Sequence, residues 1–303
     1  MPDVRNRGTV ERPYRRVTPG GAAPSRADVV ALEEPLEIRV AGDTVAITMR
    51  TPGADHALAA GFLLSEGIVH SVDDLGTMSH CGRTDQEGYG NALDVLPAPG
   101  VQLVWERVTA SRRGTLTSAA CGVCGRERID DLLARIEPLG DGPAVDARLV
   151  ASAPDRLRSA QQAFERTGGT HAAMVLAEDG SVLAVHEDVG RHNAVDKVVG
   201  TLVLEGRIGP CRSPAPGPRP ALLVVSGRSS FEMVQKAAMA RIPVLASVGA
   251  ASSLAVDLAD RAGVALATFV RGGSFNLYTH PERIRSAGST VEGETGVDPS
   301  CKL

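Results

Sequence analysis

The chain of 303 residues lacks three features that would assign it to other classes of protein. No apolar run approaches the ~20 residues of a membrane-spanning helix, and the N-terminus lacks the apolar core of a signal peptide. The formal net charge of -4 gives no overall reason to expect a nucleic-acid partner. The five cysteines are odd in number and irregularly spaced, which does not suit a disulfide framework. The sequence therefore predicts a soluble protein of a reducing cytoplasm, without a membrane or nucleic-acid partner.

The composition and length predict two modest domains. Hydrophobic residues make up 43% of the chain and charged residues 22%, as in ordinary globular proteins. Residues 1–27 are rich in Arg, Gly and Pro and have no apolar period, which predicts a disordered tail. We expect an N-terminal mixed α+β domain over 28–145, a second domain over 146–285, and a flexible tail over 286–303.

In the first of these domains, the apolar pattern predicts a β-hairpin followed by a helix. Apolar residues alternate over 36–49 on both sides of a short Gly-containing turn. An apolar-rich helix is predicted over 55–66, and a glycine ends it. Short strands are predicted over 92–96 and 101–107.

In the second domain, predicted strands and helices alternate. The strands are expected at 172–177, 182–186, 221–225, 243–248 and 264–270, and the helices at 152–168, 193–204, 229–241 and 253–261. Such alternation indicates a three-layer α/β domain with a mainly parallel sheet.

Two cysteines stand close together near the end of the first predicted domain, in a loop that a predicted helix follows. Cys121 and Cys124 frame the segment Cys-Gly-Val-Cys-Gly. Thiols at this spacing can bind one metal ion or share work on a sulfur atom. Residues 126–136 predict a helix that contains two arginines near its start, and both the helix dipole and these charges favour a thiolate at Cys124. The segment predicts a reactive sulfur site, with half of a zinc site, completed by His80 or Cys81, as the alternative.

Polar segments also follow or precede the strands of the second domain. They cover 168–171, 187–193, 226–230 and 271–276. Since ligands of α/β domains bind at the carboxyl ends of strands, these segments together predict a pocket for a large phosphate-bearing ligand. The alternative is simple capping of the helices that follow.

Four segments together resemble a known family. They are Met49 to Gly67, the Cys-Gly-Val-Cys-Gly segment, Glu187 to Lys197 (EDVGRHNAVDK), and Ser226 to Lys236 (SGRSSFEMVQK). In this order they resemble the formate dehydrogenase accessory sulfurtransferase family (FdhD), over about residues 34–283. The resemblance implies a cytoplasmic sulfur carrier. Such a carrier accepts sulfur from a cysteine desulfurase and passes it to a molybdenum or tungsten bis-pterin guanine dinucleotide cofactor before insertion into the formate dehydrogenase catalytic subunit.

The resemblance also implies a fold, an assembly and site residues. The second domain is expected to resemble the cytidine deaminase fold and the protein to form a homodimer. Cys121 corresponds to the persulfide-bearing cysteine and Cys124 to its partner, with no resident metal. The cofactor, for which GDP is a partial mimic, is expected to contact Phe269, Val270, Arg271, Gly272, Gly273 and Ser274. From their chemistry we add Ser226, Arg228 and His192 to this pocket.

Two other functions were compared with the sulfur carrier. A zinc deaminase needs a His-x-Glu motif followed by Pro-Cys-x-x-Cys, and this chain has neither in that arrangement. The second is a non-catalytic chaperone that binds the cofactor and has a redox or zinc-binding pair of cysteines. Within the carrier hypothesis, Cys124 either resolves the persulfide or tunes Cys121, and both roles stay open.

Overall fold

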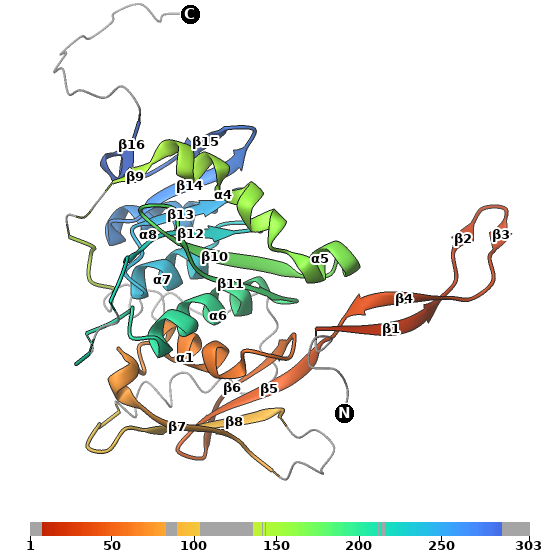
Figure 1. Cartoon of the computed structure of the whole chain (residues 1–303), viewed down its shortest axis with the longest axis horizontal. Coiled ribbons are helices and arrows are strands. Elements are labelled where there is room, and N and C mark those ends of the chain that lie inside the picture. Colours follow the sequence, from red (N-terminus) through yellow and green to blue (C-terminus); the bar gives the residue numbers. More distant parts are fainter. Residues whose placement is uncertain are drawn as a thin grey trace, which may run out of the picture.

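The computed structural model describes residues 8–82, 90–103, 136–140, 142, 144–210, 212–213 and 216–286. Figure 1 shows these residues as stacked layers of helix and sheet, with a narrow ribbon extending to one side. A six-stranded sheet lies in the C-terminal half of the chain, and a four-stranded sheet lies in the N-terminal half. Helices lie between the two sheets.

The six-stranded sheet is mixed. Its strands are β10 (His171–Ala177), β11 (Val182–Asp188), β12 (Pro220–Val225), β13 (Val244–Ser247), β14 (Ala265–Arg271) and β15 (Ser274–Leu277), in the order β11-β10-β12-β13-β14-β15. Only β12, β13 and β14 are parallel to one another. The expectation of a mainly parallel sheet is therefore wrong. Hairpins join β10 to β11 and β14 to β15, and β10 also runs antiparallel to β12.

Helices cover both faces of this sheet. One face carries α4 (Ala147–Ser159), and the other carries α6 (Arg191–Leu204), α7 (Phe231–Met239) and α8 (Ser253–Ala262). Side chains of β10 alternate between the two cores, with Met174 facing α4 and Val175 facing α6. The predicted α/β class is confirmed, and the likeness to the cytidine deaminase fold stays a prediction.

The helix predicted over 152–168 differs from the observed elements. Asp146 caps α4 by accepting a 2.7 Å hydrogen bond from the backbone N–H of Arg148, so the helix begins earlier than expected and contains Pro154. The chain breaks at Gln161, and the short helix α5 (Gln162–Thr167) follows. The proline was expected to begin the helix because this residue suits a first turn, whereas the aspartate cap is the stronger start signal.

The N-terminal half folds as predicted around its hairpin and helix. Strands β5 (Glu34–Val40) and β6 (Asp43–Arg50) form the hairpin, and the four-stranded sheet has the order β6-β5-β8-β7 with β7 (Leu75–His80) and β8 (Ala92–Pro97). The predicted helix is α1 (Asp55–Ser65). Residues 101–103 are not a strand, and 104–107 of that prediction lie outside the described residues.

Helix α1 lies against α6, where glycines allow the two backbones to come very close. A Cβ built at Gly61 would lie 2.0 Å from the carbonyl oxygen of Asp196, and one at Gly200 would lie 1.8 Å from that of Ala57. One cluster of buried apolar side chains consequently includes Leu58 of α1 and Val198 of α6, as well as residues of both sheets. The predicted domain boundary near residue 145 stays a prediction, but the two halves share a core.

Residues 9–31 form a ribbon where a disordered tail was expected over 1–27, and residues 1–7 of that prediction lie outside the described residues. Strand β1 (Thr9–Tyr14) pairs antiparallel with β4 (Arg26–Ala31), and β2 (Val17–Thr18) pairs with β3 (Gly21–Ala22) near the tip. Its side chains are mostly exposed, so no apolar period marks it in the sequence. The remaining short elements are η2 (Val72–Asp74), η3 (Pro281–Arg283), β9 (Val145–Asp146) and β16 (Ile284–Arg285). The predicted tail after Ser286 lies outside the described residues.

Candidate pocket at the sheet edge

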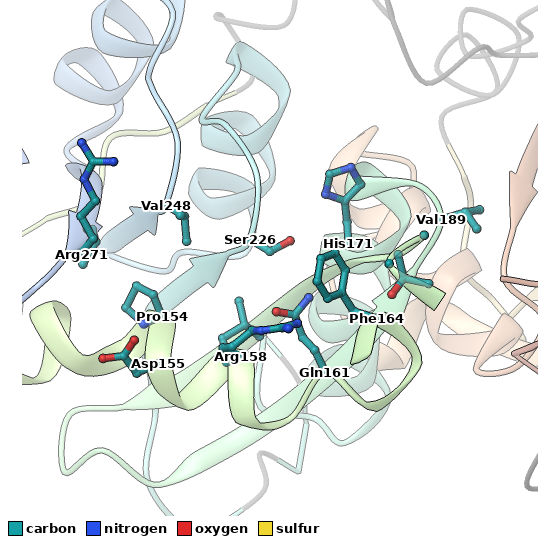
Figure 2. Close-up of a pocket in the computed structure, with 15 residues that line it drawn as sticks. Pro154, Asp155, Arg158, Gln161, Phe164, His171, Val189, Ser226, Val248 and Arg271 are labelled. Carbon is teal, nitrogen blue, oxygen red and sulfur yellow. The ribbon is translucent and has the colours of Figure 1, made fainter. Parts of the chain in front are cut away.

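A cavity of about 600 Å³ lies where the parallel strands end. Ser226 follows β12, Val248 follows β13, and Arg271 ends β14, and all three line the cavity (Figure 2). Because β10 is antiparallel to β12, its first residue, His171, reaches the same edge. Residues of α4 and α5 form the opposite wall. The cavity therefore lies at the carboxyl edge of the sheet, as the polar segments predict.

The wall opposite the strands is built from α4 and α5. The guanidinium of Arg158 lies 4.5 Å from the ring centroid of Phe164, a cation–π contact between the two helices. Glu187 of β11 fixes α5, since its carboxylate accepts 2.8 Å hydrogen bonds from the backbone N–H groups of Ala163 and Phe164 and from the hydroxyl of Thr170. Glu187 thus positions α5 so that the stacked Arg158 guanidinium and Phe164 ring lie beside the cavity.

The His171 end of the cavity has a positive electrostatic environment. Burial lowers the pKa of His171, the positive charges of Arg191 and His192 lower it further, and the Asp188 carboxylate opposes them. A Cβ built at Gly227 would lie 3.7 Å from both His171 Nδ1 and Arg191 Cδ, which places the two side chains around this glycine. An anionic group at this end would be attracted by the Arg191 guanidinium and would favour the protonated imidazole of His171.

The predicted contact segment after β14 forms a tight turn. Arg271 pairs with Ser274 across the hairpin, and Gly272 and Gly273 between them have φ values of 58° and 79°. Two successive positive φ angles are typical of a type I′ turn, which glycine adopts without strain. Of the six predicted contacts, Val270 and Arg271 line the cavity. Gly272, Gly273 and Ser274 form the turn at its rim.

Of the other predicted pocket residues, one lines the cavity and three do not. Ser226 lines the cavity and accepts a 2.9 Å hydrogen bond from the backbone N–H of Ala172. Phe269 is exposed and has a φ of 51°. Arg228 is exposed outside the cavity lining. His192 also lies outside the lining and forms an ion pair with Glu232 of α7.

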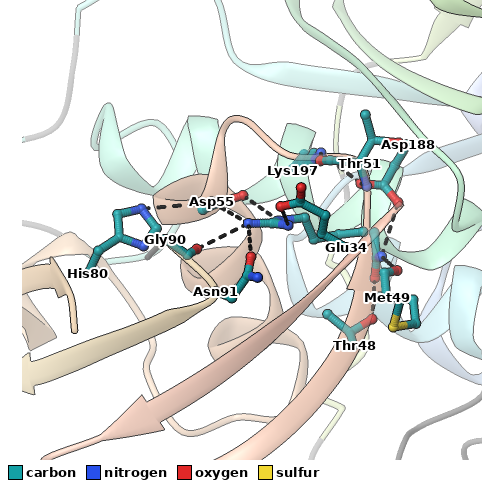
Figure 3. Close-up of polar contacts among 12 residues, drawn as sticks. Glu34, Thr48, Met49, Thr51, Asp55, His80, Gly90, Asn91, Asp188 and Lys197 are labelled. Atoms are coloured by element: carbon teal, nitrogen blue, oxygen red, sulfur yellow. Dashed lines mark hydrogen bonds and ion pairs between the residues drawn. The ribbon is translucent and has the colours of Figure 1, made fainter. Parts of the chain in front are cut away.

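The EDVGRHNAVDK segment serves mainly to join the two halves of the molecule. Lys197 Nζ lies 2.7 Å from Asp188 Oδ2 and donates a 2.7 Å hydrogen bond to the carbonyl of Thr51 (Figure 3). Asn193 donates to the carbonyl of Met49 at 2.8 Å and to Asp188 Oδ1 at 3.0 Å. Of this segment only Val189 lines the described cavity, so its interpretation as a pocket wall stays a prediction for the other residues.

A second buried polar cluster lies at the end of β6, where the sequence analysis predicts no site. Arg50 donates to both carboxylate oxygens of Asp55 at 3.0 Å, and its side chain is 2% exposed. It also donates to the carbonyl of Gly90 at 3.1 Å (Figure 3). The sequence signal for this cluster is the spacing of Arg50 and Asp55 on the two sides of the turn between β6 and α1. This pair fixes the start of α1.

The predicted sulfur site at Cys121 and Cys124 lies outside the described residues, as do Cys211 and Cys301. Cys81 is a free thiol that follows β7 of the four-stranded sheet and does not line the cavity. Among the described residues, no group of three or more His, Cys, Asp or Glu side chains is arranged to hold a metal ion. In the same part of the chain, no helix has both the length and the apolarity to cross a bilayer. The zinc alternative, which includes Cys121 and Cys124, is not tested by these residues.

Comparison with known proteins places the chain in a family. The model of the FdhD/NarQ family matches residues 31–285. The chain belongs to this family. A sulfur carrier protein FdhD from Anaeromyxobacter dehalogenans is 55% identical over 283 residues, which cover 90% of this chain and 98% of that relative. The Mycobacterium tuberculosis sulfur carrier protein FdhD is 49% identical over 268 residues, covering 86% and 93%.

A solved structure supports the fold of this FdhD/NarQ chain. It is a crystal structure described as that of a formate dehydrogenase accessory protein from Desulfotalea psychrophila. The two share a TM-score of 0.68 and 24% identity, over 91% of this chain and 99% of the other. At this identity the likeness bears on the fold alone. It extends over both halves of the FdhD/NarQ chain.

Proposed function

We propose that this protein is a sulfur carrier that supplies sulfur to the cofactor of formate dehydrogenase. The observation that carries the proposal is the 55% identity to a relative named sulfur carrier protein over 98% of that relative's length. The donor is a cysteine desulfurase persulfide, and the recipient is a molybdenum or tungsten bis-pterin guanine dinucleotide cofactor. The protein therefore acts as a sulfurtransferase through a covalent intermediate on one of its own cysteines.

Cys121 accepts the sulfur in this proposal. Its thiolate attacks the outer sulfur of the donor persulfide, the donor's S–S bond breaks, and the donor cysteine leaves as a thiolate. Because only the thiolate is nucleophilic and a free cysteine titrates near ~8.5, the arginines in the sequence that follows would favour the reactive form. The product is a persulfide on Cys121.

Cys124 has two possible roles that an experiment can separate. As a resolving thiolate it attacks the inner sulfur of the persulfide, which releases hydrosulfide and leaves a Cys121–Cys124 disulfide. That disulfide must then be reduced by an external thiol. As a tuning residue it leaves the persulfide intact until the cofactor accepts the sulfur. A disulfide that accumulates during delivery supports the first role.

The cavity at the sheet edge is the proposed site for the guanine dinucleotide portion of the cofactor. The guanidinium groups of Arg158 and Arg271 suit an anionic ligand, His171 adds an imidazole that a bound phosphate would help to protonate, and apolar residues such as Val270 complete the lining. GDP should therefore bind and raise the melting temperature by mass action. Arg271→Ala is expected to weaken binding. An unchanged melting temperature at millimolar GDP would contradict this part of the proposal.

Intact-mass measurement tests the carrier step directly. After incubation with a cysteine desulfurase and cysteine, the wild-type protein should gain one sulfur atom that a reductant removes. Cys121→Ala should neither gain this sulfur nor activate formate dehydrogenase. Cys81→Ala is the matched control, since this free cysteine should be dispensable for both. Full activation by Cys121→Ala would refute the carrier mechanism.

A non-catalytic chaperone is the second candidate. It is supported by the lining of the cavity, whose arginines and apolar residues suit a nucleotide ligand whether or not a cysteine takes part. Replacement of both Cys121 and Cys124 separates the two functions. A chaperone would retain activation of formate dehydrogenase and GDP binding, whereas a sulfur carrier would retain only GDP binding.

A further inference from the structure

One carboxylate stands out in the lining of the cavity. Among the described residues that line it, Asp155 of α4 is the only acidic side chain. The lining also contains two cations, Arg158 and Arg271, together with the imidazole of His171. A negative charge would weaken binding of a phosphate-bearing ligand if phosphate occupied the cavity along its whole length. Asp155 therefore indicates a part of the cavity that receives another portion of the ligand.

The position of Asp155 separates the cavity into two ends. Figure 2 shows Asp155 and Pro154 on the α4 side near the end where β14 contributes Arg271, whereas His171 and Phe164 lie at the other end. Arg191 and His171 both lie around Gly227 at this end, so the anionic portion of a ligand fits there. The end beside Asp155 is left for the portion that carries hydrogen-bond donors.

The Asp155 carboxylate does not pair with Arg158 of its own helix. Arg158 is three residues further along α4, a spacing at which the two side chains could pair. The guanidinium of Arg158 instead lies over the ring of Phe164 at 4.5 Å. Figure 2 also shows the Arg271 side chain directed away from Asp155. Asp155 is exposed, and no ion pair or side-chain hydrogen bond joins its carboxylate to another described residue, so both oxygens can accept from a ligand.

An ionised carboxylate accepts hydrogen bonds and donates none, and its two oxygens match two parallel N–H groups. Among the common bases, guanine alone presents two adjacent N–H donors, N1–H and the N2 amine, on its Watson–Crick edge. Adenine offers one donor next to an acceptor there. Hypoxanthine lacks the N2 amine, and xanthine has an oxygen in its place. The Arg158 guanidinium, which Figure 2 shows between Asp155 and Phe164, also offers a flat group that suits stacking with a base.

We propose that Asp155 is the residue that selects guanine over other bases, by accepting hydrogen bonds from N1–H and the N2 amine. The inference rests on the proposed function, because it assigns the base end of the same cavity. It adds an orientation: the base lies beside Asp155 and the turn after β14, and the diphosphate lies toward His171. Asp155 is thus a specificity-determining residue and takes no part in sulfur transfer.

Calorimetric binding of four nucleoside diphosphates tests the proposal. For the wild-type protein we expect GDP to bind about tenfold more tightly than IDP, as one lost hydrogen bond predicts, and ADP and XDP to bind more weakly still. In Asp155→Asn the amide can donate to the O2 atom of xanthine. The preference of this variant should therefore shift from GDP toward XDP, and its ratio of GDP to ADP affinity should fall by about tenfold or more.

The ratio of affinities is the decisive quantity, since removal of any negative charge near the cavity can tighten all four ligands together. Glu165→Gln on α5 is the matched control, because it removes an exposed carboxylate that does not line the cavity. It should leave the ratio of GDP to ADP affinity unchanged. Circular dichroism and the melting temperature of Asp155→Asn check that the fold is retained.

The outcomes separate this inference from the proposed function. Binding of GDP with an unchanged base preference in Asp155→Asn overturns the role of Asp155 and leaves the cofactor site standing. Equal binding of GDP and ADP by the wild type overturns it as well. Failure of all four nucleotides to bind overturns the cofactor site itself, and the assignment of Asp155 with it.

Discussion

Lys197 and Asp188 form a buried ion pair with an Nζ–Oδ2 distance of 2.7 Å, and their side chains are 3% and 0% exposed. The carboxylate also accepts a 3.1 Å hydrogen bond from the backbone N–H of Thr51. Lys197 donates to the backbone carbonyl of the same residue. Both charged residues belong to the C-terminal half, and Thr51 belongs to the N-terminal half. The pair is therefore part of the joint between the halves.

Lys197→Met should destabilise the fold strongly. It leaves the Asp188 carboxylate buried without its cation, and a broken buried pair typically costs ~3–5 kcal/mol in the free energy of unfolding. Denaturant unfolding measures the change. Arg148→Ala is the control, because its ion pair with Asp146 joins a side chain that is 82% exposed, and the unfolding midpoint should hardly move. Equal effects of the two substitutions would contradict a structural role for the buried pair.

Gly61→Ala should force α1 away from α6. The added Cβ would lie 2.0 Å from a backbone oxygen of Asp196, and a helix backbone cannot rotate out of the way as a side chain can. Overpacking of a core commonly costs ~1–3 kcal/mol, and this contact is at the severe end. Thermal unfolding should show the loss. Gly140→Ala, where nothing lies within 4 Å of the built Cβ, should leave the melting temperature unchanged.

His186 should make the fold sensitive to mild acid. Burial, and secondarily the charge of Lys197, lower the pKa of His186 from 6.5 to about 4. The unfolded chain therefore binds a proton that the folded chain does not, and stability falls as the pH drops from about 6.5 to about 4, by about 3 kcal/mol in total. His186→Gln keeps a donor for Thr201, whose hydroxyl lies 2.9 Å from Nε2, but cannot titrate. Its unfolding free energy should depend less on pH, and an unchanged slope would assign the acid sensitivity to other groups.

His171 should couple nucleotide binding to pH. In the free protein its pKa is lowered by burial and by the nearby cations. A bound diphosphate favours the protonated imidazole and raises this pKa, so GDP affinity should increase as the pH falls from 8 toward 6. His171→Gln should bind GDP with a weaker pH dependence, and the slope that remains measures the titration of the phosphates themselves. Identical slopes for both proteins would place the diphosphate elsewhere.

The local elements could be predicted from the sequence because neighbouring residues determine them. The alternation around Gly42 and the apolar run before Gly67 gave the hairpin and α1 correctly. The direction of the strands in the C-terminal sheet could not be predicted from the sequence, because a strand of the parallel core and a strand of a hairpin have similar composition. The exposed ribbon could not be recognised from apolar alternation because its pairing depends on the backbone.

The candidate site was predicted in part for a similar reason. Ser226 and Arg271 could be predicted because each lies at the end of a strand at the expected edge, whereas Val270 came from the family resemblance. Asp155, Arg158 and Phe164 lie on the opposite wall, and only the tertiary packing of α4 and α5 shows that they face the strands. Asp188 and Lys197 look equally typical of a binding site in the sequence. Their partner Thr51 lies more than 130 residues earlier, so their role in the joint could not be inferred from local pattern.

The ribbon formed by β1 and β4 has a consequence for solubility. A paired ribbon that projects from the body leaves outer edges whose backbone groups can hydrogen-bond to strands of other chains. Pro13 within β1 removes one edge donor, and Arg12 and Arg26 add charge along it. These residues discourage association between the ribbon edges of two molecules. Replacing them with β-branched residues should leave the fold of each chain intact and should cause the protein to aggregate.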